Sequence, residues 1–209
     1  MISKILNVGL AIVVVILALE LSQAKRANTD LQNATDATPT LNVIAQRSSI
    51  RAYSDQPVED EKVTELLRAA MAAPTARDCR PWAFIVIKDS TLLKTIADSL
   101  PNSKMAAKAR LAIAVCGDMT KAMKGGGRDF WIQDASAATE NLLLAATAQG
   151  LGAVWTGIFP NEERTAITQR ILNLPEHIIP LNIIPVGYPA GEATPKDKWN
   201  PENIHYDRW

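Results

Sequence analysis

The sequence is poor in the residues that build metal sites and covalent cross-links. It has only two cysteines, Cys79 and Cys116, and two histidines, His177 and His205, and none of them forms a Cys-x-x-Cys pair or another cluster. The sequence therefore signals neither a disulfide framework nor a zinc site, and no metal is expected. Cys116 ends an apolar segment, so we interpret it as a small core residue rather than as a nucleophile.

An excess of positive charge is also missing. Lysine and arginine number 22, aspartate and glutamate number 22, and the formal net charge is zero. Binding to nucleic acid calls for a basic face, so no nucleic-acid partner is expected and any anion site must be local. Glycine-rich phosphate loops are missing as well, because "KGGGRD" at 124–129 lacks the Gly-Lys-Ser/Thr ending and "GLGAVWTGIFP" at 150–160 is not a Gly-x-Gly-x-x-Gly sequence.

One long apolar run is present, at the N-terminus. Residues 5–19 are almost wholly apolar, follow Lys4 and precede the small-residue sequence "LSQA". This pattern predicts that residues 1–24 are a signal peptide and that the protein is exported or periplasmic. The alternative is an uncleaved membrane anchor, with the domain on the cytoplasmic or the periplasmic side, and a membrane partner is expected only in that case.

The remainder divides into a linker and one domain. Residues 25–40 are polar and lack periodicity, so they are predicted to form a flexible linker. Residues 41–209 are predicted to form the folded domain, since the chain is 47% hydrophobic and 21% charged and can bury one sizeable core.

Helical and strand patterns alternate within this domain. Four strands are predicted from apolar runs at 82–89, 109–118, 151–157 and 178–189. Helices are predicted at 41–51, 60–73, 90–99 and 128–149, with another that begins near Asn161. The final stretch has no period of its own but carries Trp199, Tyr206 and Trp209, so we expect it to wrap over this domain or over a second copy of it.

Two basic segments are candidates for an anion site. In "AQRSSIRAYSDQPV" at 45–58, Arg47 and Arg51 would share one face of a helix, where like charges repel unless an anion lies between them. Two serines between the arginines add hydroxyl donors, so a phosphate matches the segment. Lys196 and Lys198 point the same way in an extended chain and could reach the same phosphate. The alternatives are a solvated helix end and ordinary surface lysines.

Two further segments lie at strand ends. In "AAPTARDCRPWAF" at 72–84 a helix stops at Pro74, and a loop of small and polar residues leads into a buried strand. Such loops often bind ligands in folds of this kind. The strand at 151–157 ends in Gly157, which allows a ligand to approach the backbone closely. Each segment alone would also fit an ordinary connection.

In this order, the segments resemble the nitroreductase family of flavin enzymes. The matching stretches are "QRSSIRAYSDQPV", "APTARDCRPWAF", "DASAATENLLLAATAQGLGAVWTG" and "VGYPAGEATPKDKW", and the resemblance covers about 41–209. It implies an α+β fold of three layers, with a mixed central sheet, helices on both faces and a C-terminal tail that wraps over the partner of an obligate homodimer.

The resemblance also implies FMN as cofactor, NADH or NADPH as reductant, and a nitroaromatic, quinone or similar small molecule as acceptor in a ping-pong cycle. The flavin carries the chemistry, so no catalytic side chain is expected. Arg51 would reach the pyrimidine edge of the ring, and the backbone at Thr156 and Gly157 would face its N5 atom. The phosphate would be held by Arg47, Ser48, Ser49, Lys196 and Lys198. The partner chain would supply Pro74, Thr75, Ala76 and Asp78.

Two features set this chain apart from the usual family pattern. Asp78 and Arg80 stand where Asn and Gln are usual, and a carboxylate there would oppose negative charge on the flavin unless it pairs with Arg80 or Arg77. Thr156 stands where some members have an acidic residue, so the substrate stays open. Export would also separate the enzyme from NADH and NADPH. The alternative function is therefore an exported flavin-binding or partner-binding protein of the same fold, with another electron donor or no turnover.

Overall fold

The computed structural model describes residues 19, 20, 22 and 39–209. The predicted signal peptide or anchor at 1–24 lies outside the described residues, except for these three positions, and so does nearly all of the predicted linker. Helix α2 (Pro39–Gln46) begins two residues before the predicted start of the domain.

The remaining elements follow the predicted order. The helices are α3 (Asp60–Met71), α4 (Ser90–Ser99), α5 (Phe130–Ala148) and α6 (Glu162–Ile171). The strands are β1 (Trp82–Ile87), β2 (Leu111–Asp118), β3 (Gly152–Ala153), β4 (Thr156–Gly157) and β5 (Ile178–Gly187). Short 3-10 helices are η1 (Ala76–Asp78), η2 (Lys104–Lys108), η3 (Gly125–Gly127) and η4 (Pro201–Asn203). Side-chain caps fix two of the helix starts, since Asp89 accepts a hydrogen bond from the Leu92 amide and Asn161 from the Arg164 amide.

The sheet is built around β5. Its strand order is β1-β2-β5-β3, and β4 also pairs with β5. All four ladders are antiparallel, and an isolated bridge between Ser49 and Ala153 adds a parallel pairing beside β3. Every residue of β2 is buried, as expected for a strand that is apolar on both faces.

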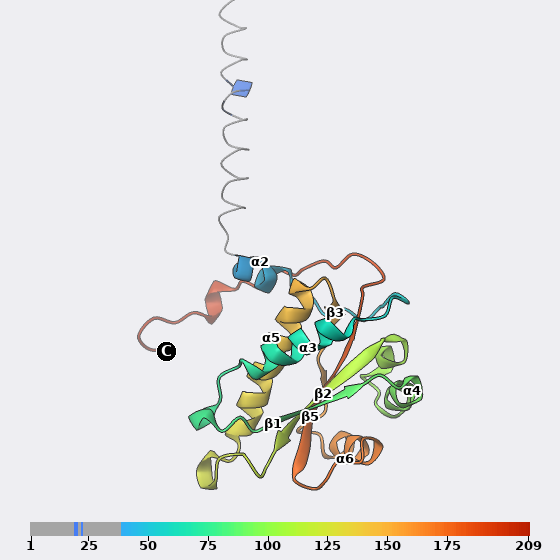
Figure 1. The fold of residues 1–209 in the computed structure, drawn as a ribbon. Coiled ribbons are helices and arrows are strands. Elements are labelled where there is room, and N and C mark those ends of the chain that lie inside the picture. The colour runs from blue at the N-terminus through green and yellow to red at the C-terminus, as the bar shows by residue number, and fades with distance from the viewer. Residues whose placement is uncertain (1–18, 21, 23–38) are drawn as a thin grey trace, which may run out of the picture. The chain divides into compact units, whose positions relative to one another are not determined.

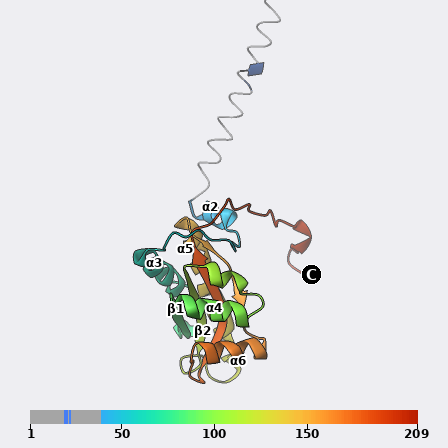
Figure 2. The ribbon, with the colours of Figure 1, turned by 90° about the vertical axis from the view of Figure 1, so that its right-hand side faces the viewer.

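Helices cover both faces of the sheet. Figures 1 and 2 show α3 and α5 on one side and α4 and α6 on the other. Side chains of β2 alternate between the two faces of the sheet. Ile113 and Val115 pack into the core on the side of α3 and α5, and Ala114 and Cys116 into the core on the side of α4 and α6. Burial raises the pKa of the Cys116 thiol to about 12, so it stays protonated. The interpretation of Cys116 as a core residue is confirmed.

The segment after α2 is extended, so the prediction of a helix through residue 51 is wrong beyond Gln46. The Ile50 amide donates to the Ala153 carbonyl at 3.0 Å, and Tyr53 forms an antiparallel bridge with Pro189. Tyr53 is buried, and burial raises the pKa of its hydroxyl, which lies 2.8 Å from the Ile50 carbonyl oxygen. Pairing with the strands that follow replaces the helical hydrogen bonds here, and Arg51 therefore does not continue the face of α2.

The C-terminal tail has no core of its own. Trp199, Tyr206 and Trp209 are 73%, 84% and 100% exposed, and Figure 1 shows the tail running away from the sheet. These side chains were predicted to pack on this domain or on a second copy of it, and the structure shows that they do not pack on this domain. A second copy of the chain remains the candidate.

Candidate functional site

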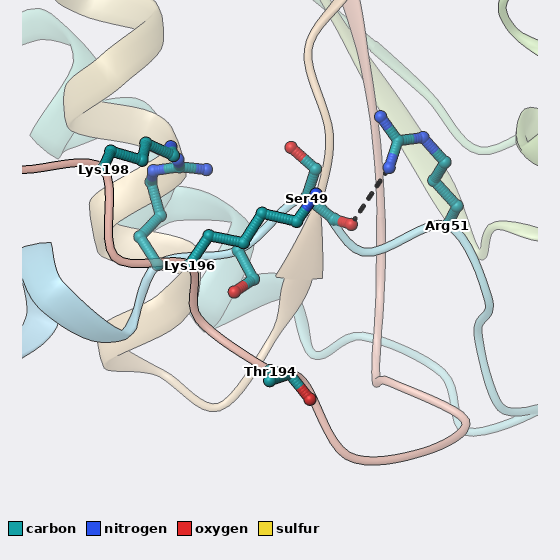
Figure 3. Close-up of a pocket in the computed structure, with 7 residues that line it drawn as sticks. Ser49, Arg51, Thr194, Lys196 and Lys198 are labelled. Atoms are coloured by element: carbon teal, nitrogen blue, oxygen red, sulfur yellow. Dashed lines mark hydrogen bonds between the residues drawn. The ribbon is translucent and has the colours of Figure 1, made fainter.

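A pocket of about 260 Å³ lies where the segment after α2 meets the C-terminal tail (Figure 3). Its lining residues are Arg47, Ser48, Ser49, Arg51, Thr194, Lys196 and Lys198. Six of these seven were predicted from sequence as phosphate or ring contacts, and the structure brings them together from segments about 150 residues apart. Thr194 was missed, although its spacing of two from Lys196 places it on the same side of an extended chain.

The side chains within the pocket have different directions. In Figure 3 the Lys196 side chain extends toward Ser49, and Lys198 lies on the same side. Arg51 lies on the other side of Ser49 and extends toward it, and its Nη1 atom donates to the Ser49 carbonyl oxygen at 3.3 Å. The pocket therefore has a lysine side and, across the Ser49 backbone, a separate arginine.

The pocket holds more positive than negative charge. Arg47 forms an ion pair with Glu140 of α5, 3.4 Å between Nε and Oε1, and the Arg47 side chain is only 17% exposed. In residues 39–209 the structure shows no ion pair for Arg51, Lys196 or Lys198. Like charges gathered in this way repel one another, so an anion bound among them is stabilised by all of them.

The loop predicted to come from a partner chain adopts a backbone that is unusual for its residue types. Arg77, Asp78 and Arg80 have φ values of 51°, 54° and 48°. The buried carboxylate of Asp134 in α5 holds the loop by accepting a hydrogen bond from the Ala76 amide at 2.8 Å. Non-glycine residues in this conformation cost free energy and often mark functional loops.

Asp78 in this loop is neutralised by Arg80. The Arg80 Nε and Nη2 atoms donate to the two Asp78 carboxylate oxygens at 2.7 and 2.6 Å. These hydrogen bonds lower the pKa of Asp78 and raise that of Arg80. Of the two pairings predicted from sequence, the one with Arg80 is confirmed.

The Thr156 side chain of β4 is buried and hydrogen-bonded inside the protein. Its hydroxyl donates to the Ile183 carbonyl at 2.6 Å and accepts from Ser103 at 3.0 Å. The Gly157 carbonyl accepts from Asn102 Nδ2 at 3.1 Å and from Arg164 Nη1 at 3.4 Å. Sequence reasoning missed the contact from Arg164, because nothing in its local pattern points to a carbonyl in the preceding strand.

The predicted site residues form two groups in one chain. The pocket adjoins β3 through the bridge between Ser49 and Ala153, and β4 follows directly. Pro74, Thr75, Ala76 and Asp78 do not line that pocket. Their loop is anchored instead to the first half of α5 through Asp134.

Comparison with known proteins identifies the relatives of this chain. Residues 44–112 and 97–188 match the profile of the Nitroreductase family. A candidate NADH dehydrogenase/NAD(P)H nitroreductase of Methanothermobacter thermautotrophicus is 43% identical over 81% of this chain and 87% of its own. A solved structure with a similar name, from Parabacteroides distasonis, is 50% identical with a TM-score of 0.78, and the match covers 81% of this chain and 98% of the other. An FMN-dependent nitroreductase from Clostridium difficile is 28% identical with a TM-score of 0.74, over 81% and 99%.

These relatives correct the predicted localisation. The prediction of an exported, periplasmic or membrane-anchored protein is wrong. The relatives are named for their use of NADH or NADPH, and export would separate the enzyme from these reductants. Among the residues that the structure describes, no helix is both long and apolar enough to cross a membrane.

The comparisons and the fold agree with the resemblance seen in the sequence. The α+β architecture, with a central sheet between two pairs of helices, is shared with the solved relatives over about four fifths of this chain. The family profile matches more than half of the chain, and the sequence identity to the relatives reaches 43% and 50%. The chain belongs to the nitroreductase family.

Proposed function

We propose that the protein is a homodimeric, FMN-dependent enzyme that uses NADH or NADPH to reduce nitroaromatic, quinone or similar small acceptors in a ping-pong cycle. Its coarser classification, as an NAD(P)H-dependent oxidoreductase of the nitroreductase and FMN reductase kind, follows from its family and relatives. The alternative of an exported flavin-binding protein without turnover has no support once export is set aside.

The observation that carries this proposal is the pocket of cations and hydroxyl groups. A flavin phosphate brings up to two negative charges and several acceptor oxygens, and Lys196, Lys198 and Arg47 offer charged donors to them. Each hydrogen bond between charged groups contributes about 1.5–3 kcal/mol. Among the described residues, Glu140 is the one carboxylate in an ion pair with these cations, so the pocket stays positive until an anion binds. The residues present fit the phosphate group.

The other site residues would serve the ring. Arg51, which lies across Ser49 from the lysines, would contact its pyrimidine edge, and the backbone at Thr156 and Gly157 would face N5. Asn102 and Arg164 would hold that backbone in place through the Gly157 carbonyl. When bound, FMN supplies the chemistry by accepting a hydride from NADH or NADPH and passing it to the acceptor.

Two features support a homodimer in which each site draws on both chains. The loop at 74–78 lies outside the pocket of its own chain, and the aromatic side chains of the tail are exposed. In a dimer the tail would cover the partner, and the loop would complete the partner's site. Exposed aromatic side chains of this size gain free energy when a partner covers them.

Replacing Arg80 by glutamine is expected to slow reduction of the bound flavin by NADH about tenfold, because the Asp78 carboxylate would then face the ring unpaired. Because the Arg80 hydrogen bonds lower the pKa of Asp78, the stabilisation from the pair is complete above the ordinary pKa of an aspartate and is lost as the pH falls through the lowered value. Stopped-flow absorbance measures the rate at neutral pH.

The matched control adds Asp78→Asn to Arg80→Gln, which restores the neutral Asn and Gln pair usual in the family. This double variant is expected to recover most of the wild-type rate. An Arg80→Gln variant that is reduced as fast as the wild type would show that the Asp78 charge does not act on the flavin.

Initial-rate kinetics test the ping-pong cycle. Rates measured over a range of NADH concentrations, at several fixed concentrations of a quinone, are expected to give parallel double-reciprocal lines, because both substrates use one site in turn. The same measurement with NADPH identifies the preferred donor, and protein stripped of flavin is the control. Intersecting lines would contradict the ping-pong cycle, and failure to oxidise either nucleotide would contradict the proposed function.

A further inference from the structure

Arg164 is a half-buried cation in the first turn of α6. Its Nη1 atom donates to the Gly157 carbonyl oxygen at 3.4 Å, and among the described residues this is the one hydrogen bond of its guanidinium group. No carboxylate of residues 39–209 forms an ion pair with it, although Glu162 and Glu163 are its neighbours in the helix. A guanidinium group has several N–H donors, so most donors of Arg164 are free to bind a ligand.

The contact of Arg164 lies where the reaction is expected to take place. Gly157 is one of the two residues whose backbone would face the flavin N5 atom. A second donor, Asn102 Nδ2, reaches the same Gly157 carbonyl oxygen at 3.1 Å, so this carbonyl group is held from two sides. The positive charge of Arg164 is therefore next to the expected place of hydride transfer.

Strand β4 supplies no negative charge to balance Arg164. Thr156 stands where some members of the family have an acidic residue, and its hydroxyl is committed to the Ile183 carbonyl and to Ser103. A half-buried cation without a counter-charge favours an anionic ligand, and the planar guanidinium group matches a carboxylate in particular. A substrate that carries its own carboxylate would supply the missing charge.

An apolar surface lies beside the same glycine. The Trp155 side chain is 37% exposed, whereas the residues on either side of it, Val154 and Thr156, are each only 3% exposed. The Trp155 Nε1 atom lies 4.0 Å from the position that a Cβ atom at Gly157 would take. Aromatic side chains pack well against flat rings. The surroundings of Gly157 therefore suit a flat ring with an anionic substituent.

We propose that Arg164 determines acceptor specificity and that the preferred acceptor is a nitroaromatic compound with a carboxylate on its ring. The carboxylate binds the free donors of Arg164 and is unchanged by the reaction. Reduction of the nitro group takes up a hydride, which NADH or NADPH supplies through the cofactor, and a proton from solvent, and it yields a nitroso group and water. The inference rests on the proposed function, because it selects one class among the proposed acceptors.

Binding of 4-nitrobenzoate and 4-nitrobenzamide to the oxidised, flavin-loaded protein tests the inference without turnover. The two rings have nearly the same shape and differ in one negative charge. Isothermal titration calorimetry is expected to show that Arg164→Gln weakens 4-nitrobenzoate binding about tenfold or more and 4-nitrobenzamide binding less than twofold. Glutamine still offers a donor to the Gly157 carbonyl but has no charge. Arg164→Lys, which keeps the charge, should retain most of the preference for 4-nitrobenzoate.

Two results of this titration would overturn the inference. One is a wild-type protein that binds 4-nitrobenzamide as tightly as 4-nitrobenzoate, a result that needs no variant to fold. The other is an equal loss of both compounds in Arg164→Gln, which would assign Arg164 a structural role. Arg170→Gln, at an exposed position in the last turn of α6, is the matched control and should change neither affinity.

Stopped-flow absorbance separates the acceptor from the electron donor. Arg164→Gln is expected to slow reoxidation of the reduced flavin by 4-nitrobenzoate about tenfold or more, while flavin reduction by NADH changes less than twofold. A loss confined to reduction by NADH would overturn the inference, because Arg164 would then serve the donor. Reoxidation by quinones but by neither nitro compound would overturn it and leave the proposed function intact, whereas reoxidation by none of these acceptors would contradict both.

Discussion

Replacing Arg47 and Lys196 together by alanine will leave a folded protein that no longer retains FMN. Both side chains line the phosphate pocket, one from each of the two segments that meet there. Losing two hydrogen bonds between charged groups costs about 3–6 kcal/mol of binding free energy. That loss corresponds to an affinity lower by roughly two to four orders of magnitude. The flavin absorbance of the purified variant, relative to its protein absorbance, measures the effect.

The matched control removes the same charges elsewhere. Arg68 and Lys94 are exposed residues of α3 and α4 that do not line the pocket, and each forms a surface ion pair within its own helix. Arg68→Ala with Lys94→Ala should therefore leave flavin content unchanged and stability nearly so. Retention of one FMN per chain by the Arg47 and Lys196 double variant would show that these residues do not hold the phosphate.

Replacing Gly152 by alanine is expected to destabilise the domain and weaken FMN binding together. A Cβ atom at Gly152 would lie 2.5 Å from Ile50 Cγ2 and 2.7 Å from Ile50 Cβ. Since the Ile50 amide is hydrogen-bonded to Ala153, the strain displaces the segment that carries Ser49. Overpacking of this kind costs about 1–3 kcal/mol, and we expect flavin affinity to fall about tenfold or more. Urea unfolding and flavin titration measure the two effects.

Gly191 provides the control for that substitution. A Cβ atom there meets nothing within 4 Å, and its φ is not in the left-handed region. Gly191→Ala should therefore leave both stability and flavin affinity close to wild type. If Gly152→Ala also left stability and flavin affinity unchanged, the close packing of Ile50 against β3 would not position Ser48 and Ser49 in the pocket.

Local patterns allowed most of the fold to be predicted from sequence. β2 and β5 are apolar on both faces, which signals a sheet between two helical layers, and a capping aspartate marks the start of α4. The extended backbone at 47–58 could not be predicted in this way. Its conformation depends on pairing with Ala153 and Pro189, which lie more than 100 residues further along the chain.

The same distinction applies to the site. The pairing of Asp78 with Arg80 was open to prediction because the two residues are neighbours in the sequence, and the spacing of Thr194 from the lysines was also visible there. The ion pair between Arg47 and Glu140 and the contact from Arg164 to the Gly157 carbonyl were not, since only the packing of α5 and α6 brings those groups together.

The absorbance spectrum of protein purified without added flavin tests the central claim most directly. We predict a flavin band that bleaches on anaerobic addition of NADH or NADPH and returns when a quinone or nitroaromatic is added. A band that bleaches with dithionite but with neither nucleotide would contradict the proposed electron donor. No flavin band, even after incubation with FMN, would contradict the assignment of the pocket of Arg47, Lys196 and Lys198 to a flavin phosphate.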